Sequence, residues 1–275
     1  MNARNALNNL AAWSRTLAVA PPAKMLRPAP PETAVAVALI AATMMAMFTV
    51  DAAATAWARG LPQWFRDVFE QITNLGLSGW FLIPFGVVLV CLAAAISDAL
   101  SKVSRGVLAA LAGRFGFLFL AIGVPGLFVT IVKRLIGRAR PFVGGGADDP
   151  FAYMPAVWRP EYAAMPSGHA TTAVAAAIAI GAVWPRLRVP MWLYALVIMF
   201  SRVVVLAHHP SDVIAGALTG SAGVYLVRRW FAARRIVFSP LDLQSFPGPS
   251  WRRIRRACGE IFANGRPIER GRKAL

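Results

Sequence analysis

Long runs of apolar residues without a charge are the feature that most constrains the fold of this chain. A helix that crosses the hydrocarbon core of a bilayer needs roughly 20 consecutive apolar residues, and several charge-free runs approach or exceed that length. The chain is 57% hydrophobic and only 15% charged, whereas a soluble protein carries about 25% charged residues. These runs favour membrane spans over the alternative, a large buried helical core in a soluble protein.

We predict an all-α membrane protein, a bundle of six transmembrane helices. The last three runs are shorter than the others because polar residues intrude at their ends. The predicted spans are residues 33–50, 71–97, 115–132, 170–185, 189–201 and 213–227.

The segments on either side of the spans are polar. Residues 1–31 contain several prolines and lack an early apolar stretch, so we predict a disordered cytoplasmic tail rather than a signal peptide. Residues 32–230 form the predicted membrane domain, and residues 231–275 form a predicted basic cytoplasmic tail. The arginines at 252–256 favour attraction to anionic lipid over the alternative, RNA binding, and we expect no nucleic-acid partner.

The distribution of basic residues predicts the orientation of the bundle. The net charge is +17, and most of the 29 Lys and Arg residues lie in the two tails and in the second and fourth loops. Basic residues in short loops and tails mark the cytoplasmic side of a membrane. The first, third and fifth loops are therefore expected outside, and the compact chain with its proline-rich basic head suggests a bacterial inner membrane with these loops in the periplasm.

The first outer loop contains a segment with helical periodicity, residues 61–75. Its apolar residues recur on one side of a helix, and Arg66, Asp67 and Glu70 lie opposite them. This pattern predicts an amphipathic helix on the outer face. Such a helix either lies on the outer leaflet or packs against the bundle.

Three polar clusters lie at the outer ends of the predicted spans. Their sequences are Lys133-x6-Arg140-Pro141, Pro166-Ser167-Gly168-His169 and Ser201-Arg202-x5-His208-x3-Asp212. In an up-and-down bundle the ends of the third and fifth spans meet the starts of the fourth and sixth on one membrane face. We therefore expect the three clusters to form one site.

The first two clusters contain groups that bind anions. Lys133 and Arg140 are seven residues apart, so they share one face of a helix, and the Arg fork suits bidentate binding of phosphate. Ser167 is a natural N-cap, and Gly168 permits close approach of the backbone. The free N–H groups of the following helix make an anion site beside His169.

The third cluster contains a candidate nucleophile and its partner. Asp212, in the first turn of the last span, is placed to accept a hydrogen bond from one nitrogen of His208, which leaves the other nitrogen free to attack. Arg202 is a charge inside a span, and such charges are costly and usually functional. A regular helix puts it about 9 Å below His208, so the site is expected to be recessed into the membrane.

Other polar residues near these clusters fit the site less well. His209 points elsewhere on any regular backbone, and Arg134 and Arg138 lie off the face that Lys133 and Arg140 share, so we assign them as loop or interface charges. The pair Asp148–Asp149 has no third ligand at a suitable spacing. We therefore predict neither a metal nor a cofactor.

Together the three motifs resemble the signature of the type 2 phosphatidic acid phosphatase (PAP2) superfamily, over residues 133–212. The resemblance implies an integral-membrane lipid phosphatase that needs no metal. It implies that His208 is the nucleophile that forms a phosphohistidine, that Asp212 orients it, and that His169 protonates the leaving oxygen. The implied phosphate-binding residues are Lys133, Arg140, Ser167, Gly168 and Arg202.

The expected function is hydrolysis of a lipid phosphate or diphosphate at the outer membrane face. The candidate substrates are phosphatidate, phosphatidylglycerol phosphate, a polyprenyl diphosphate and the lipid A phosphates. A lipid phosphotransferase that uses the same phosphohistidine and a non-catalytic protein that binds or transports phospholipids are the alternatives. Vanadate-dependent haloperoxidases resemble the same motifs, but they are soluble, and six spans argue against that activity.

Overall fold

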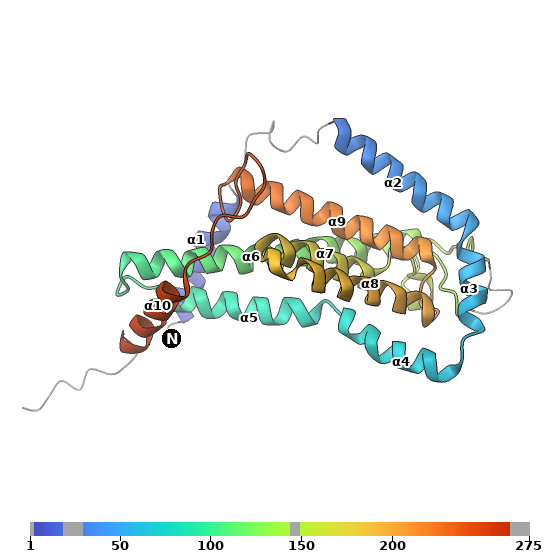
Figure 1. Ribbon diagram of the computed structural model, residues 1–275, viewed down its shortest axis with the longest axis horizontal. Helices are drawn as coiled ribbons and strands as arrows, with labels where there is room; N and C mark the ends of the chain where they lie inside the picture. The colour runs from blue at the N-terminus through green and yellow to red at the C-terminus, as the bar shows by residue number, and fades with distance from the viewer. Residues whose placement is uncertain (1–2, 19–29, 144–148, 265–275) are drawn as a thin grey trace, which may run out of the picture.

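The computed structural model describes residues 3–18, 30–143 and 149–264, and its regular elements over these ranges are helices (Figure 1). The long helices are α1 (Ala3–Ala18), α2 (Pro30–Thr49), α3 (Asp51–Arg59), α4 (Gln63–Thr73), α5 (Gly79–Ala95), α6 (Lys102–Ile136), α7 (Gly168–Val183), α8 (Arg188–Val204), α9 (Pro210–Ala233) and α10 (Trp251–Asn264). Short 3-10 turns lie at η2 (Asn74–Gly76), η3 (Pro160–Tyr162) and η4 (Pro185–Leu187).

Helices α5 to α9 form an up-and-down bundle around α7 (Figure 1). Helix α7 contacts α6, α8 and α9, and its side chains are buried along almost its whole length. In this arrangement α6 ends, α7 begins, α8 ends and α9 begins at the same end of the bundle. The three sequence clusters lie at that end.

Small residues let α7 and α9 approach closely. A Cβ on Gly216 would lie 2.4 Å from the carbonyl oxygen of Ser167, and a Cβ on Gly220 would lie 2.6 Å from that of Thr171. Close backbone approach through Gly, Ala and Thr is the usual way in which helices pack in membranes. The contact brings the N-terminus of α7 against the first turns of α9, where Ser167 N–H donates to the carbonyl of Asp212 (3.0 Å).

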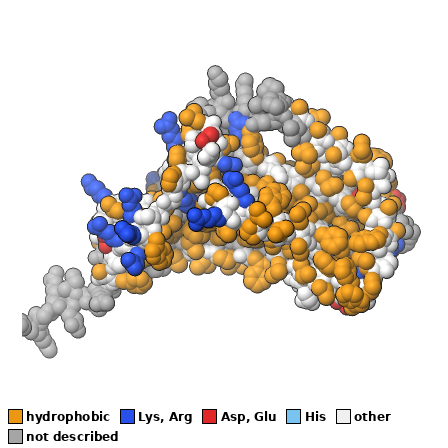
Figure 2. Space-filling view, viewed as in Figure 1, with side chains coloured by type: hydrophobic (Ala, Val, Ile, Leu, Met, Phe, Trp, Pro, Cys, Tyr) orange, Lys and Arg blue, Asp and Glu red, His pale blue; other side chains and the backbone are white. Residues whose placement is uncertain are grey.

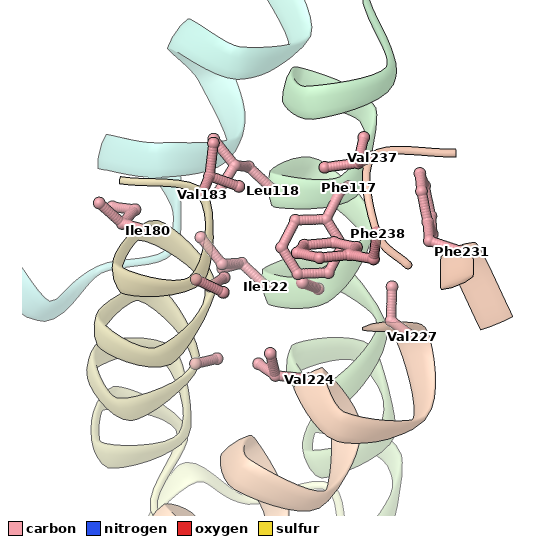
Figure 3. Packing of buried hydrophobic residues seen from close by; sticks show 14 of the residues in the cluster. Phe117, Leu118, Ile122, Ile180, Val183, Val224, Val227, Phe231, Val237 and Phe238 are labelled. Carbon is pink, nitrogen blue, oxygen red and sulfur yellow. The ribbon is translucent and has the colours of Figure 1, made fainter. Parts of the chain in front are cut away.

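The apolar core lies toward the other end of the bundle (Figure 3). Phe117 of α6 makes edge-on contacts with Phe231 of α9, at a centroid distance of 5.5 Å, and with Phe238, at 4.6 Å. Aromatic pairs in this geometry add to the stabilisation from burial alone. These ring contacts hold the segment after α9 against α6. The polar clusters lie at the opposite end of the bundle.

A helix lies at each of the six predicted spans, but fewer helices meet a length and hydropathy test for crossing a membrane. Among the described residues, three do so: Gln63–Ala95, Lys102–Ile136 and Pro185–Val204. A fourth is added if residues 36–49 and Asp51–Arg59, which meet at a 53° bend, form one broken span. Helix α7 is apolar but shorter. The prediction of six spans therefore stays a prediction.

The face of the bundle shown in Figure 2 is largely apolar. Large apolar side chains on α2, α5 and α8 are exposed, among them Ile40, Ile83 and Leu193. Exposed apolar areas of this extent indicate a surface that contacts a membrane or another protein. In the view of Figure 2, Lys and Arg side chains cluster around α10, away from the end where α3 and α4 lie.

The structure corrects the prediction of a disordered N-terminal tail. Residues 3–18 form α1, which packs on α5, and the Asn9 amide donates to the carbonyls of Ala93 and Ile96 at the end of that helix (2.8 and 3.0 Å). The orphan carbonyls of a helix C-terminus need such donors, which gives α1 a structural role. Residues 19–29 of the same predicted tail lie outside the described residues.

The C-terminal segment also folds back on the bundle rather than leaving it as a tail. Its amphipathic helix α10 places Ile254, Ala257 and Ile261 against apolar residues of the α5–α6 connection and α6. The Glu260 carboxylate accepts hydrogen bonds from Ser101 N–H and Oγ at the N-terminus of α6 (both 3.0 Å). Hydrogen bonds from the Ser104 side chain, from Ser101 and from Arg256 lower the pKa of Glu260 to about 2.

The predicted amphipathic helix of the first outer loop is present as α4. Phe69 packs edge-on against Phe200 of α8 at 5.4 Å, so the helix does pack against the bundle. Trp64, on the same helix, is 67% exposed. The outer-leaflet position of this helix stays a prediction.

Candidate active site

The predicted site residues meet at the end of the bundle where four helix termini converge. Lys133 lies in the last turn of α6, and Arg140 follows after the αL residue Gly137, which ends that helix. Arg202 lies near the end of α8, and His208 lies in the connection to α9. Lys133, Arg140 and Arg202 all lie close enough to act on the charge of His208. His169 has the same three cations and His208 as electrostatic neighbours.

The N-terminus of α7 forms as the sequence predicts. Ser167 is the N-cap, and its hydroxyl accepts a long hydrogen bond from Ala170 N–H (3.5 Å). Ser167 is fully buried, and a Cβ on Gly168 would meet no atom within 4 Å. The free N–H groups of this first turn lie beside His169, which is the arrangement of a helix N-terminal anion site.

The expected hydrogen bond between His208 and Asp212 is not formed. The His208 Nδ1 atom lies 3.7 Å from Asp212 Oδ2, beyond hydrogen-bonding distance. Nδ1 has no other hydrogen-bond partner in the described part of the chain. Asp212 instead accepts from Arg138 Nη1 at Oδ1 (2.5 Å) and from His209 N–H at Oδ2 (2.9 Å).

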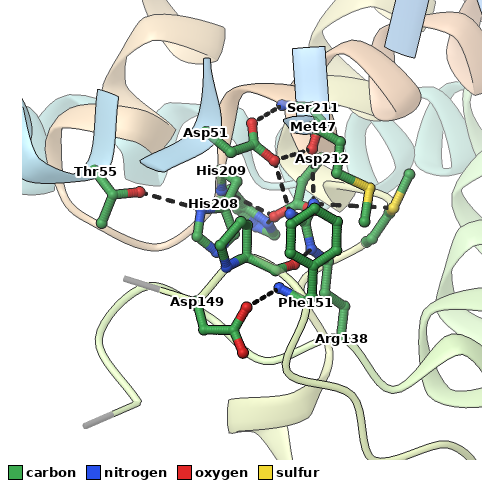
Figure 4. Close-up of polar contacts among 12 residues, drawn as sticks. Met47, Asp51, Thr55, Arg138, Asp149, Phe151, His208, His209, Ser211 and Asp212 are labelled. Atoms are coloured by element: carbon green, nitrogen blue, oxygen red, sulfur yellow. Dashed lines mark hydrogen bonds and ion pairs between the residues drawn. The ribbon is translucent and has the colours of Figure 1, made fainter. Parts of the chain in front are cut away.

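A buried ionic network surrounds Asp212 (Figure 4). Arg138 donates to Asp51 Oδ2 (2.7 Å), to Asp212 and to the Ser211 hydroxyl (2.7 Å), and its Nε donates to the Pro150 carbonyl (3.0 Å). Ser211 N–H and Oγ donate to the Asp51 carboxylate (2.9 and 2.5 Å). The network joins α3, the loop after α6 and the first turn of α9.

Arg138 does lie in a loop at an interface between segments, but its charge is buried and paired within this network, which the sequence did not predict. Its side chain has no exposed surface, and neither do the side chains of Asp51 and Asp212. Burial alone lowers the pKa of Arg138, but the charges of Asp212 and Asp51 outweigh that effect and raise the pKa above its ordinary value. Arg138 remains a cation and compensates two buried carboxylates.

The remaining polar residues of this region lie away from His208. His209 faces Thr55 of α3, with Nδ1 3.1 Å from the Thr55 hydroxyl. The Arg134 guanidinium lies over the Trp158 ring at 5.6 Å. Asp149 is exposed and accepts from Phe151 N–H (2.8 Å), and its neighbour Asp148 lies outside the described residues.

Arg202 is oriented by a residue of α4. Its Nη1 donates to the Thr73 hydroxyl (2.5 Å), and Thr73 also lies 3.0 Å from Ser201 Oγ. Three residues further on, Gly76 lies against His169: a Cβ there would be 3.0 Å from His169 Cδ2 and 2.7 Å from Ile198. The segment from Thr73 to Gly76 therefore contacts both Arg202, a predicted phosphate-binding residue, and His169, the predicted acid.

A cavity of about 560 Å³ leads to these residues, a size typical of small-molecule sites. Arg140, His169 and Arg202 line it together with residues of α4 and of the chain just after α8. Burial and the charges of Arg202 and Arg140 lower the pKa of His208 well below its ordinary value of 6.5. The imidazole is therefore neutral at physiological pH, as a nitrogen nucleophile requires.

Comparison with known proteins connects this geometry to a family. The PAP2 superfamily matches residues 114–236. A lipid A 1-phosphatase from Rhizobium etli is 35% identical over 218 residues, which are 76% of this chain and 91% of the relative. The chain belongs to the PAP2 superfamily.

Two further likenesses were found. A lipid A 1-phosphatase from Rhizobium johnstonii is 32% identical over 177 residues, 63% of this chain and 70% of the relative. The crystal structure of a transmembrane PAP2-type phosphatidylglycerolphosphate phosphatase from Bacillus subtilis is similar with a TM-score of 0.48. It shares 20% identity and covers 70% of this chain and 93% of that one.

Sequence reasoning missed Asp51, Thr55 and Thr73 in this PAP2 chain. Asp51 ends a long apolar run, and a carboxylate at such a position is usually paired and functional, so a signal was present. Thr55 and Thr73 carry no such signal, because a single hydroxyl near a helix end is compatible with many roles. Their partners lie more than 100 residues away along the chain.

Removing the Arg138 charge is expected to destabilise the protein. The Arg138→Met variant leaves Asp51 and Asp212 buried without a cation, a change that typically costs about 3–5 kcal/mol. Arg134→Met, which removes only a cation–π contact, is expected to cost about 1 kcal/mol or less. Unfolding of both variants in mixed detergent micelles measures the difference, and equal stabilities would contradict the role of the network.

His208 is expected to titrate below pH 6.5, the ordinary value for the imidazole. The chain has three histidines, so carbon-13 NMR of histidine-labelled protein resolves few resonances, and His208→Gln identifies the one of interest. Arg140→Gln is expected to raise this pKa, because it removes a positive neighbour. A His208 pKa at or above 6.5 in the wild type would contradict the electrostatic account.

Proposed function

We propose that this protein hydrolyses a phosphate ester of a membrane lipid through a phosphohistidine at His208. The observation that carries the proposal is the convergence of His208, His169 and three cations at one end of the bundle, beside a cavity that Arg140, His169 and Arg202 line. His208 Nδ1 faces the Asp212 side, so Nε2 is the attacking atom. A neutral buried imidazole beside cations is suited to attack on a phosphorus atom, because the cations stabilise the charge that develops.

The reaction proceeds in two displacements at phosphorus. The Nε2 lone pair forms the N–P bond while the bond from phosphorus to the lipid oxygen breaks, and His169 gives its proton to that oxygen. A water molecule then attacks the phosphohistidine, and His169 takes a proton from it as the N–P bond breaks and phosphate leaves. The site residues position these partners and stabilise charge, which is the main source of catalysis in phosphoryl transfer.

The phosphate oxygens are held by side-chain cations and by the helix N-terminus. Lys133, Arg140 and Arg202 supply positive charge, and the backbone around Ser167 and Gly168 supplies N–H donors. These groups take the place that metal ions have in other phosphoryl-transfer sites. We therefore propose that hydrolysis needs no metal.

The relatives favour one of the four candidate substrates. Both are lipid A 1-phosphatases, and the alignment with the Rhizobium etli protein covers 91% of its length. We propose lipid A that carries a 1-phosphate as the first substrate to test. A cavity that opens at the end of an apolar bundle suits a substrate whose acyl chains stay in the bilayer.

We further propose six spans, a periplasmic site and a cytoplasmic α10 that lies on anionic lipid. Support comes from the gathering of basic residues around α10 (Figure 2), where the arginines 252, 253, 255 and 256 are exposed. Cys258 on α10 is an exposed free thiol. In a Cys91→Ser background, a membrane-impermeant maleimide is expected to label it in inverted vesicles but not in intact cells, and the reverse result would overturn the orientation.

Phosphate release from a lipid panel tests the proposed reaction. Wild-type protein in detergent with a chelator is expected to release phosphate from lipid A, and His208→Ala is expected to lose this activity by at least about a thousandfold, since the nucleophile is removed. Release that needs an added divalent cation would contradict metal independence. Equal release by wild type and His208→Ala would overturn the mechanism.

A further inference from the structure

One wall of the active-site cavity is the polar face of α4. Gln63, Arg66 and Glu70 of α4 line the cavity together with Asn74, which follows the helix, and the spacing of the three α4 residues puts them on one side of the helix. Arg140, His169 and Arg202 also line the cavity. When a phosphate binds at these three residues, the part of the substrate attached to it therefore lies beside α4.

We propose that this face of α4 is a subsite for a hydroxyl- or amide-bearing headgroup, such as a sugar, next to the scissile phosphate. The proposal rests on the proposed phosphatase function and adds the part of the substrate that the phosphate-binding residues do not contact. It assigns Glu70 as the central specificity-determining residue.

Three side chains of this wall, those of Gln63, Glu70 and Asn74, suit hydroxyl and amide groups. The amides of Gln63 and Asn74 both donate and accept hydrogen bonds, whereas the carboxylate of Glu70 accepts them. Hydroxyl and amide N–H groups are the donors that such a carboxylate binds.

The neighbours of Glu70 on α4 are held in place by one another. Arg66 donates to Gln63 Oε1 (2.8 Å), and Gln63 Nε2 donates to Asp67 Oδ1 (2.6 Å). Arg66 and Gln63 therefore present a fixed arrangement toward the cavity. Such pre-organisation lowers the cost of binding a polar ligand.

The subsite is mechanically connected to the catalytic groups. Helix α4 ends at Thr73, whose hydroxyl accepts a hydrogen bond from Arg202. The turn η2 follows directly and ends at Gly76, which lies against His169. Binding of a headgroup on α4 therefore bears on the position of both residues. Binding energy from a non-reacting part of the substrate can position the catalytic groups, and it then raises kcat as well as lowering KM.

Two substrates and one pair of variants test the proposal. Lipid A with a 1-phosphate presents hydroxyl and amide groups beside the phosphate, whereas phosphatidate has both of its other glycerol oxygens acylated. Glu70→Ala is compared with Gln71→Ala, because Gln71 is the next residue on α4, is exposed and does not line the cavity. Initial rates for both lipids are measured in the same mixed micelles.

Glu70→Ala is expected to lower kcat/KM for lipid A about tenfold or more, the effect of losing a hydrogen bond to a charged group. Its kcat/KM for phosphatidate is expected to change less than about twofold, and Gln71→Ala is expected to match wild type on both lipids. Equal effects of Glu70→Ala on the two lipids, or no effect on lipid A, would overturn the subsite while the phosphatase function stands. Absence of turnover of both lipids by wild type would overturn the proposed function itself.

Discussion

The buried ion pairs of Arg138 with Asp51 and Asp212 are the interaction on which the functional end of the bundle depends. Three charges without solvent contact are costly to bury, and they are tolerated only when they are paired and fully hydrogen-bonded. Here the pairing joins α3, the loop after α6 and the start of α9. Because Asp212 is held by Arg138 and by His209 N–H, the connection that carries His208 is fixed relative to the end of α6.

The cations of this region fall into two kinds. Arg138 is neutralised by carboxylates of the protein, whereas Lys133, Arg140 and Arg202 take part in none of the ion pairs that the described residues make. The Nε atoms of Arg140 and Arg202 also lack a hydrogen-bond partner within that part of the chain. Cations that lack an ion-pair partner beside a cavity favour an anion, and the N-terminus of α7 adds N–H donors close to them.

Much of this site was predictable from the sequence, because the constraints that build it are local. Charge-free runs locate the helices, and the alternation of direction in a bundle brings Lys133, His169, Arg202 and His208 to one end. The cap at Ser167 follows from its position before an apolar helix. The same reasoning predicted an α4 helix from the spacing of Trp64, Phe65, Val68 and Phe69.

The parts that the sequence did not predict depend on contacts between distant segments. Arg138 was set aside because it lies off the face that Lys133 and Arg140 share on a continuous helix. Helix α6 ends at Ile136, however, and the αL turn at Gly137 redirects Arg138 into the protein. Helix α1 was missed because its stabilisation comes from packing on α5 rather than from its own composition. The expected bond from Asp212 to His208 failed because Arg138 and His209 N–H compete for the same carboxylate.

Trapping the covalent intermediate tests the central claim most directly. Wild-type protein is mixed with lipid that carries a labelled phosphate, quenched within the first turnover and digested, and the labelled peptide is sequenced. The account predicts an alkali-stable, acid-labile phosphoryl group on His208, which is lost in His208→Gln and retained in His209→Gln. Turnover without any phosphorylated histidine, or with the label on His169 or His209, would contradict it.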